Sequence, residues 1–213
     1  MKLDLFVFIS VQLLRTLEFR SQVKDLHERL LEVLQKDHND SPLPKGFTMK
    51  IQIPDRYSQL EHVSFLGTST IFEYAKYLWN KEWVVLVNKT KIPLWTSDNP
   101  ISFYNTFGRS GYNMGIFSPG IEIRFPLSSE LLLFSYDPNT HPPILNKNKM
   151  SEDDVLLSNN TQIRTSTRFI YSAANSFEYA SEYLKKYPRY KDPGRKRWDL
   201  INYQDRIEFG RID

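Results

Sequence analysis

Trp95-Thr96-Ser97-Asp98-Asn99-Pro100 is the stretch around which the predicted fold is organised. Proline has no backbone N–H and disfavours helical geometry in the residue before it, so Asn99 should be extended and a regular strand should stop at Pro100. Ser97 and Asp98 have short polar side chains that bond nearby backbone amides and stabilise turns. Apolar residues flank the stretch on both sides. We therefore predict a turn at the rim of a sheet, where functional groups are often displayed.

The sequence leaves two interpretations of Asp98 open. In the first, Asp98 only closes its own turn, because Asp, Asn and Pro are common turn residues. In the second, Ser97 and Asp98 are catalytic residues, with Asp98 as a general base or metal ligand, and Asn99 is a ligand-binding amide.

The composition favours one folded domain with an aromatic core. The chain has 213 residues, of which 40% are hydrophobic and 14% aromatic. It has no cysteine, which excludes disulfides, cysteine nucleophiles and thiolate metal sites. The four histidines are scattered without a zinc-binding spacing, so no metal site is predicted and the cofactor is left undetermined.

Apolar periodicity predicts an α+β fold, with N-terminal helices, a central mainly antiparallel sheet of about five strands, and C-terminal helices on one face. The Ser151 position is typical of a helix start, because Ser is followed by three acids in the first turn. The predicted helices span residues 3–36 (one helix or two), 55–80 with a break near Gly67, 151–173 and 176–186. The predicted strands span residues 47–53, 83–87, 94–96, 101–104, 121–125 and 131–136, and residues 105–120 are predicted to be a glycine-rich loop.

The charge distribution separates a basic C-terminal tail, residues 187–213, from a single α+β domain, residues 1–186. Residues 185–197 contain seven Lys/Arg and one Asp, a local charge of +6, whereas the whole chain carries only +3. Interleaved tyrosines would allow this run to follow a phosphate backbone. The predicted nucleic-acid-binding residues are Lys185, Lys186, Arg189, Arg195, Lys196 and Arg197. The alternative is a solvated tail.

The apolar start of the chain, Leu5 to Val11, indicates a buried helix. It is far shorter than the roughly 20 residues of a membrane span, and no small-residue cleavage site follows it. We therefore expect a cytoplasmic protein that does not associate with membranes.

Two further groups of charged residues could belong to a ligand site. Asn160, Arg164 and Arg168 are spaced four apart in the predicted helix 151–173, where they would share one face and could clamp a phosphate or a carboxylate. With Asp98 they would form either a phosphodiester or nucleotide site or a structural ion pair between helix and sheet. Arg15 and Arg20 could face the same cleft. Alternatively, Arg15 forms a surface pair with Glu18.

Three stretches together resemble a bacterial family known as domain of unknown function 4238. They are LLRTLEFR (13–20), WTSDNPI (95–101) and the segment from Asn159 or Asn160 to Tyr171-Ser172, with RFPLSSE (124–130) between them. The similarity covers most of residues 5–175. The family pattern begins further upstream, with a His-Tyr-Val-Pro-like segment, so we expect a truncated or divergent member. The resemblance implies no established reaction, but it implies that one site contains Arg15, Arg20, Ser97, Asp98, Asn99, Asn160 and Arg168.

The sequence thus predicts a protein that handles phosphate or nucleic acid, and it leaves enzymatic activity undecided. Its expected partner is nucleic acid or a phosphorylated ligand. The alternative is a non-enzymatic protein-interaction module in which the polar cluster is structural.

Overall fold

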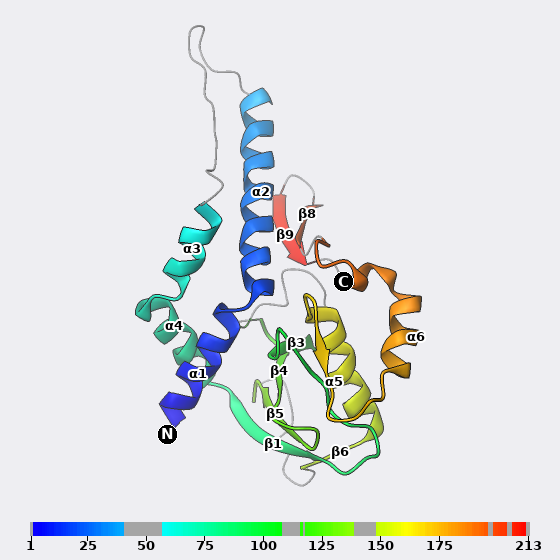
Figure 1. Ribbon diagram of the computed structural model, residues 1–213. Coiled ribbons are helices and arrows are strands. Elements are labelled where there is room, and N and C mark those ends of the chain that lie inside the picture. The colour runs from blue at the N-terminus through cyan, green and yellow to red at the C-terminus, as the bar shows by residue number, and fades with distance from the viewer. Residues whose placement is uncertain are drawn as a thin grey trace, which may run out of the picture.

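The computed structural model describes residues 2–40, 57–107, 116, 118–138, 148–195, 198–203 and 206–211. Within these residues the chain forms six α-helices, a short 3₁₀ helix, a five-stranded sheet and two separate strand pairs (Figure 1). The α+β class expected from the sequence is confirmed. The predicted strand 47–53 and most of the predicted glycine-rich loop lie outside the described residues.

The N-terminal region consists of α1 (Lys2–Leu14), α2 (Leu17–Asp40), α3 (Tyr57–Phe65) and α4 (Thr68–Trp79). Thr16 separates the first two helices, because its hydroxyl accepts a hydrogen bond from the Phe19 N–H at 3.1 Å and so caps the start of α2. The predicted break at Gly67 is confirmed. A Cβ atom at Gly67 would lie 2.9 Å from the Ser64 carbonyl oxygen, so the tight connection between α3 and α4 favours glycine. In Figure 1 the far end of α2 extends beyond the other helices and strands.

The main sheet has the strand order β3-β4-β5-β1-β6. The strands are β1 (Glu82–Asn88), β3 (Ser102–Asn105), β4 (Ile121–Pro126), β5 (Leu131–Tyr136) and β6 (Lys149–Met150). Neighbouring strands run antiparallel except β1 and β6, which are parallel. The prediction of a mainly antiparallel sheet of about five strands is therefore confirmed. The short β4–β5 connection is closed by the N–H groups of Leu127 and Ser128, which both donate to the Leu131 carbonyl.

Helices cover both faces of the main sheet. Successive residues of a strand point to opposite faces, and β5 shows this directly: Leu133 packs with the Phe6 side of α1 and with α4, whereas Leu132 and Phe134 pack with Val155 of α5 (Glu152–Thr165). A third cluster joins α5 to α6 (Glu178–Lys186) through Ile163 and Ala180. The two C-terminal helices thus form a layer on one face, as expected.

The predicted helix 151–173 is wrong over its last eight residues. α5 starts with the expected cap, since Ser151 and Asp154 form a reciprocal capping box, but it ends at Thr165. The chain then turns into β7 (Ile170–Tyr171), which pairs antiparallel with β2 (Thr96–Ser97). Ser166 is already extended, with φ −61° and ψ 145°. The backbone partners offered by the 95–100 turn therefore replace those of a continued helix.

The segment assigned to a basic tail contains secondary structure that the sequence analysis did not predict. Its described part includes the 3₁₀ helix η2 (Pro188–Lys191) and an antiparallel pair, β8 (Trp198–Tyr203) with β9 (Arg206–Arg211). In Figure 1 the β8–β9 pair lies beside α2. Apolar and polar residues alternate in RIEF (206–209), which is the signal that could have predicted β9.

Candidate functional site

Two buried carboxamide side chains of α5, those of Asn159 and Gln162, form hydrogen bonds to the turn at residues 95–100 and its flanks. Asn159 accepts a hydrogen bond from the Trp95 N–H at 2.9 Å and donates one to the Pro93 carbonyl at 3.0 Å. Gln162, which is 0% exposed, donates to the Pro100 carbonyl at 2.8 Å. These side chains are three residues apart and share one face of α5, so together they hold both ends of the turn.

Ser97 and Asn99 belong to the same buried network. The Ser97 hydroxyl lies 2.7 Å from Oε1 of Gln162 and 2.9 Å from the Asn99 carbonyl oxygen. The Asn99 amide donates to the Thr165 carbonyl at 3.3 Å, at the last turn of α5. Both residues are buried. Their hydrogen-bonding groups are thus directed at the protein interior.

Asp98 contacts the segment that follows α5. Its carboxylate accepts hydrogen bonds from the main-chain N–H groups of Thr167, at 2.9 Å, and Arg168, at 2.8 Å. Its own N–H donates to the Phe169 carbonyl at 3.1 Å. A negative charge shared by two N–H donors is a strong arrangement, so Asp98 fixes the backbone path of residues 167–169.

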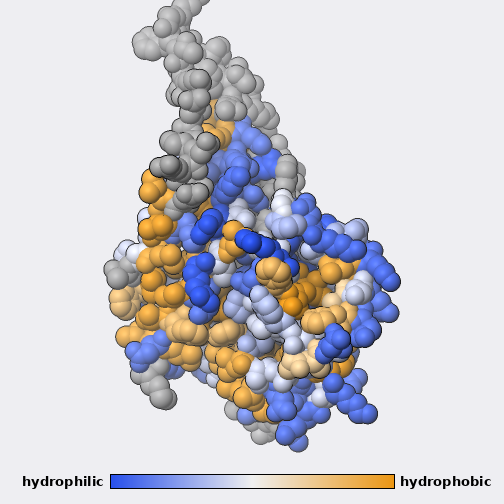
Figure 2. Space-filling view, viewed as in Figure 1, coloured by the Kyte–Doolittle hydropathy of each residue, from blue (hydrophilic) through white to orange (hydrophobic). Residues whose placement is uncertain are grey.

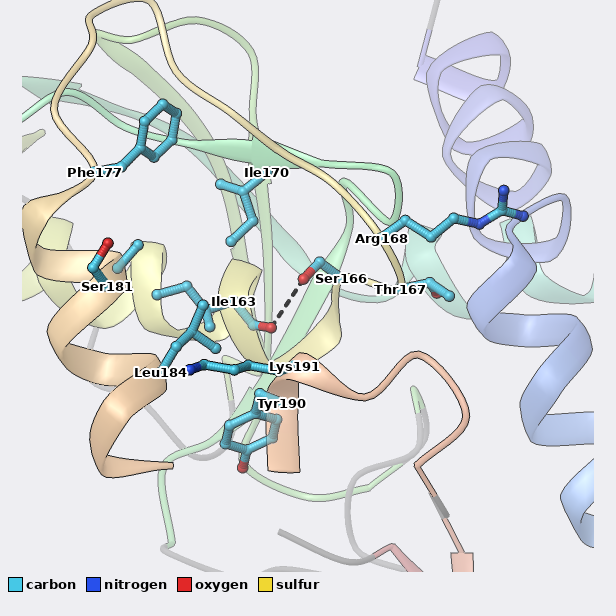
Figure 3. Close-up of a pocket in the computed structure, with 11 residues that line it drawn as sticks. Ile163, Ser166, Thr167, Arg168, Ile170, Phe177, Ser181, Leu184, Tyr190 and Lys191 are labelled. Atoms are coloured by element: carbon cyan, nitrogen blue, oxygen red, sulfur yellow. Dashed lines mark hydrogen bonds between the residues drawn. The ribbon is translucent and has the colours of Figure 1, made fainter. Parts of the chain in front are cut away.

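The row predicted from Asn160, Arg164 and Arg168 does not form, because Arg168 lies beyond the end of α5. Asn160 is partly buried and accepts a hydrogen bond from the Tyr179 hydroxyl at 2.8 Å. Arg164 is partly buried, and its charge acts on the nearby Tyr183 phenol. Arg168 is exposed. Its guanidinium points away from the cavity that lies between α5, α6 and η2, toward the N-terminal helices (Figure 3).

Arg15 and Arg20 are exposed near the α1–α2 junction, and the Arg15 Nε donates to Oε1 of Gln12 at 2.9 Å. Glu18, between them, is 1% exposed. Its carboxylate accepts a hydrogen bond from the Thr167 hydroxyl at 3.3 Å. Glu18, which one interpretation of the sequence made a surface partner of Arg15, is thus an interior residue that joins α2 to the segment after α5. No spacing in the sequence marks Glu18 as buried, so sequence reasoning missed this contact.

A cavity of about 450 Å³ lies next to this segment, between α5, α6 and η2. Its apolar lining comes from all three parts, and hydroxyl and cationic side chains also line it (Figure 3). The lining residues from α5 and the segment after it are Ile163, Ser166, Thr167, Arg168 and Ile170. The others are Phe177, which precedes α6, and the α6 and η2 residues Ala180, Ser181, Leu184, Tyr190 and Lys191. The volume lies within the range of roughly 300–1,000 Å³ that small-molecule sites occupy.

The segment formed by α6 and η2 combines tyrosine rings with cations. Tyr183 lies 4.8 Å from Tyr187 and 6.1 Å from Tyr190, measured between ring centroids. The Lys186 amine lies 5.4 Å from the Tyr187 ring centroid, and the Arg189 guanidinium 4.8 Å from that of Tyr190. We call this surface the basic aromatic face and define it as Tyr183, Lys185, Lys186, Tyr187, Arg189, Tyr190 and Lys191. Burial raises the pKa of Tyr183 to about 12.

Arg195 has a different environment from Lys185, Lys186 and Arg189. Its Nη2 donates to the carbonyl oxygens of Arg164 and Ser166, each at 2.8 Å. These carbonyls are at the C-terminal end of α5, where a positive charge is favoured by the helix dipole. Its guanidinium thus joins the basic segment to α5. Lys196 and Arg197 lie outside the described residues.

A second cavity, of about 210 Å³, brings together parts of the chain that are distant in sequence. It is lined by residues 94–96, 126–129 and 171–173. A family model described as "Protein of unknown function (DUF4238)" matches residues 1–176, which include all three segments. The chain belongs to the DUF4238 family. A search of curated proteins and a search of solved structures found no match to it.

The DUF4238 match divides the molecule at a structural boundary. It includes the 95–100 turn, α5 and the Asp98 contacts, and it ends before α6 begins at Glu178. The basic aromatic face therefore comes from residues that follow the matched part. Among the described residues of this DUF4238 protein, no helix has the length and apolar character needed to cross a membrane. Nor does that part of the chain hold a group of three or more His, Cys, Asp or Glu side chains suited to a metal ion.

Proposed function

We propose that this DUF4238 protein binds single-stranded nucleic acid along the basic aromatic face. The observation that carries the proposal is the alternation of cations and rings on α6 and η2. Lys185, Lys186 and Arg189 are exposed, and Tyr187 is 38% exposed among them. Single strands are bound by positive surfaces that follow the phosphates and by aromatic side chains on which bases stack.

The two kinds of side chain have separate roles in this proposal. The amines of Lys185 and Lys186 and the guanidinium of Arg189 neutralise phosphates, which gives an affinity that depends on salt but not on sequence. The rings of Tyr187 and Tyr190 stack on bases, and every base offers a π-face for this contact.

Asp98 has a positioning role in this proposal and not a catalytic one. Its two accepted hydrogen bonds hold the main chain of Thr167 and Arg168, two of the residues that line the cavity beside the face. Ser97 and Asn99 support the same turn from the interior. In this proposal the network fixes the main chain next to the binding surface.

The test is fluorescence anisotropy with a labelled oligonucleotide of about 15 nucleotides. Affinity should fall by roughly 20- to 50-fold between about 50 mM and 200 mM salt if three or four phosphates are neutralised. The variant K186Q/R189Q should weaken binding and flatten the salt dependence. The matched control is K24Q/K76Q, which removes two exposed cations from α2 and α4. Absent or salt-independent binding, or an equal loss in the control, would contradict the proposal.

We propose self-association as a second candidate function, because a specific apolar surface favours it. Figure 2 shows hydrophobic residues gathered over α1, α3 and α4. We call this surface the apolar face; its members are 48% to 68% exposed and are Leu3, Phe8, Leu60, Val63, Phe72 and Trp79. An aromatic side chain offers roughly 150–250 Å², so a half-exposed set of this size approaches the roughly 800 Å² per partner of a standard interface.

Sedimentation velocity over a range of protein concentrations tests this second candidate. The wild-type chain should show a concentration-dependent dimer, and F72S/W79S should remain monomeric. L127S, which removes an apolar side chain exposed on the β4–β5 connection, is the matched control. A wild-type monomer at all concentrations would contradict self-association.

A further inference from the structure

We infer that the 450 Å³ cavity receives one unstacked base of the bound strand. This inference rests on the proposed binding of single-stranded nucleic acid and adds a second element to it. Unpaired bases can be turned out of their stack and held between side chains in a pocket. The cavity supplies such a pocket directly beside the surface on which the phosphates are proposed to lie.

The walls of the cavity suit a flat ring. Phe177 and Tyr190 lie at opposite ends of the cavity, with Ile163 and Leu184 between them (Figure 3). Base rings stack favourably on aromatic side chains and are compatible with an apolar surround. A cavity of this kind therefore favours the planar base over the sugar or the phosphate.

The cavity and the basic aromatic face are continuous, because Tyr190 and Lys191 belong to both. In Figure 3 the Lys191 side chain runs along the cavity, with its amine near Leu184. That amine can bind the phosphate of the nucleotide whose base enters. The remaining phosphates would then follow the cations of η2 and α6, and the inserted base fixes the register of the strand.

The hydroxyl groups that line the cavity predict weak discrimination between bases. The Ser166 hydroxyl donates to the Ile163 carbonyl at 3.0 Å, and the Thr167 hydroxyl to the Glu18 carboxylate at 3.3 Å. The Ser181 hydroxyl is on an exposed part of the rim and can reach the edge of a base. A single hydroxyl can donate or accept, so it does not select one base strongly.

The experiment compares two oligonucleotides of equal length, one normal and one in which all bases are replaced by abasic sites. Both carry the same phosphates. S181W places a bulky ring at the mouth of the cavity, and S69W makes the same substitution at an exposed position of α4 as a control. S181F serves as the milder variant if S181W lowers the melting temperature. We expect S181W to weaken binding of the normal strand by roughly 5- to 150-fold, the value of one stacked base.

The abasic strand distinguishes the two proposals. It should bind the wild-type protein and S181W equally, since its phosphates contact only the basic aromatic face. Equal binding of the normal strand to wild type and S181W would overturn the base pocket and leave the proposed function intact. Failure of the normal strand to bind the wild-type protein would overturn both. Equal losses of the abasic and normal strands in S181W would also contradict a base pocket.

Discussion

The Asp98 carboxylate accepts a 2.8 Å hydrogen bond from the main-chain N–H of Arg168, while the Arg168 guanidinium extends elsewhere. The two residues that the sequence suggests as an acid–arginine pair thus meet through the main chain. Together with the hydrogen bond from the Thr167 N–H, this contact fixes the main chain just after the end of α5, where the chain turns toward β7. The residues around the cavity depend on that path.

The substitution D98N should destabilise the fold by about 1–3 kcal/mol, because the amide replaces one acceptor with a donor. One of the two main-chain N–H groups would then face the N–H of a carboxamide instead of an oxygen, and one hydrogen bond would be lost. Urea unfolding followed by circular dichroism measures the change in free energy. E73Q, at an exposed position of α4, should change it by less than about 0.5 kcal/mol. An unchanged stability of D98N would show that the carboxylate does not hold the segment.

The hydrogen bond between Ser97 and Gln162 should appear as an energetic coupling. Each of S97A and Q162L leaves a buried polar group without its partner, at a cost of about 1–3 kcal/mol. The double variant removes both groups, so it should be more stable than the sum of the single effects predicts, with a coupling of roughly 0.5–3 kcal/mol. Urea unfolding of the four proteins gives this value. N160A with Y179F, which share a less buried bond, form the control cycle; a coupling as small as theirs would contradict a structural network.

Local sequence patterns predicted the elements whose causes are local. The alternation in IEIRF (121–125) predicted β4, the Ser151 cap predicted the start of α5, and Gly67 marked the break between α3 and α4. The end of α5 was wrong because its cause is tertiary. The partner of the Thr167 and Arg168 N–H groups is Asp98, which lies 69 and 70 residues earlier in the chain, and no periodicity within 151–173 reports it.

The candidate site shows the same division. Ser97, Asp98 and Asn99 were identified because their residue types are typical of a polar turn, and they are indeed held against α5 and the segment after it. Gln162 and Glu18 were missed because both are polar residues whose burial depends on the opposing element. For Gln162 a signal existed: it lies seven residues after Val155, on the same face of α5, and Val155 is buried.

Arg195 should contribute more to stability than to nucleic-acid binding. R195Q removes a charge and two hydrogen bonds from the carbonyls at the end of α5, so we expect a loss of about 1–2 kcal/mol in the free energy of unfolding. R195K keeps the charge but not the forked geometry and should recover part of that loss. The comparison variant is R189Q, on the exposed side of η2. It should weaken oligonucleotide binding and leave urea unfolding nearly unchanged; the reverse pattern would assign Arg195 to the binding surface.

Tyr183 should make the fold sensitive to alkaline pH. Burial raises its pKa from 10 to about 12, nearby tyrosines add to the rise, and Arg164 opposes it. The folded state thus favours the neutral phenol and holds its proton more tightly than the unfolded state does. Its contribution to stability is fully present below pH 10 and is lost as the pH rises from 10 through 12.

Tyrosinate absorbance and urea unfolding, both followed between about pH 9 and 12, test this expectation. The wild-type protein should contain a tyrosine that ionises late, and Y183F should lose that component together with part of the stability decrease above pH 10. Y74F is the matched control, because burial raises the pKa of Tyr74 as well, but Tyr74 packs against a different core cluster. If Y183F and the wild-type protein titrate alike while Y74F differs, the late component belongs to Tyr74 and the environment of Tyr183 is more solvated than the α6–η2 packing implies.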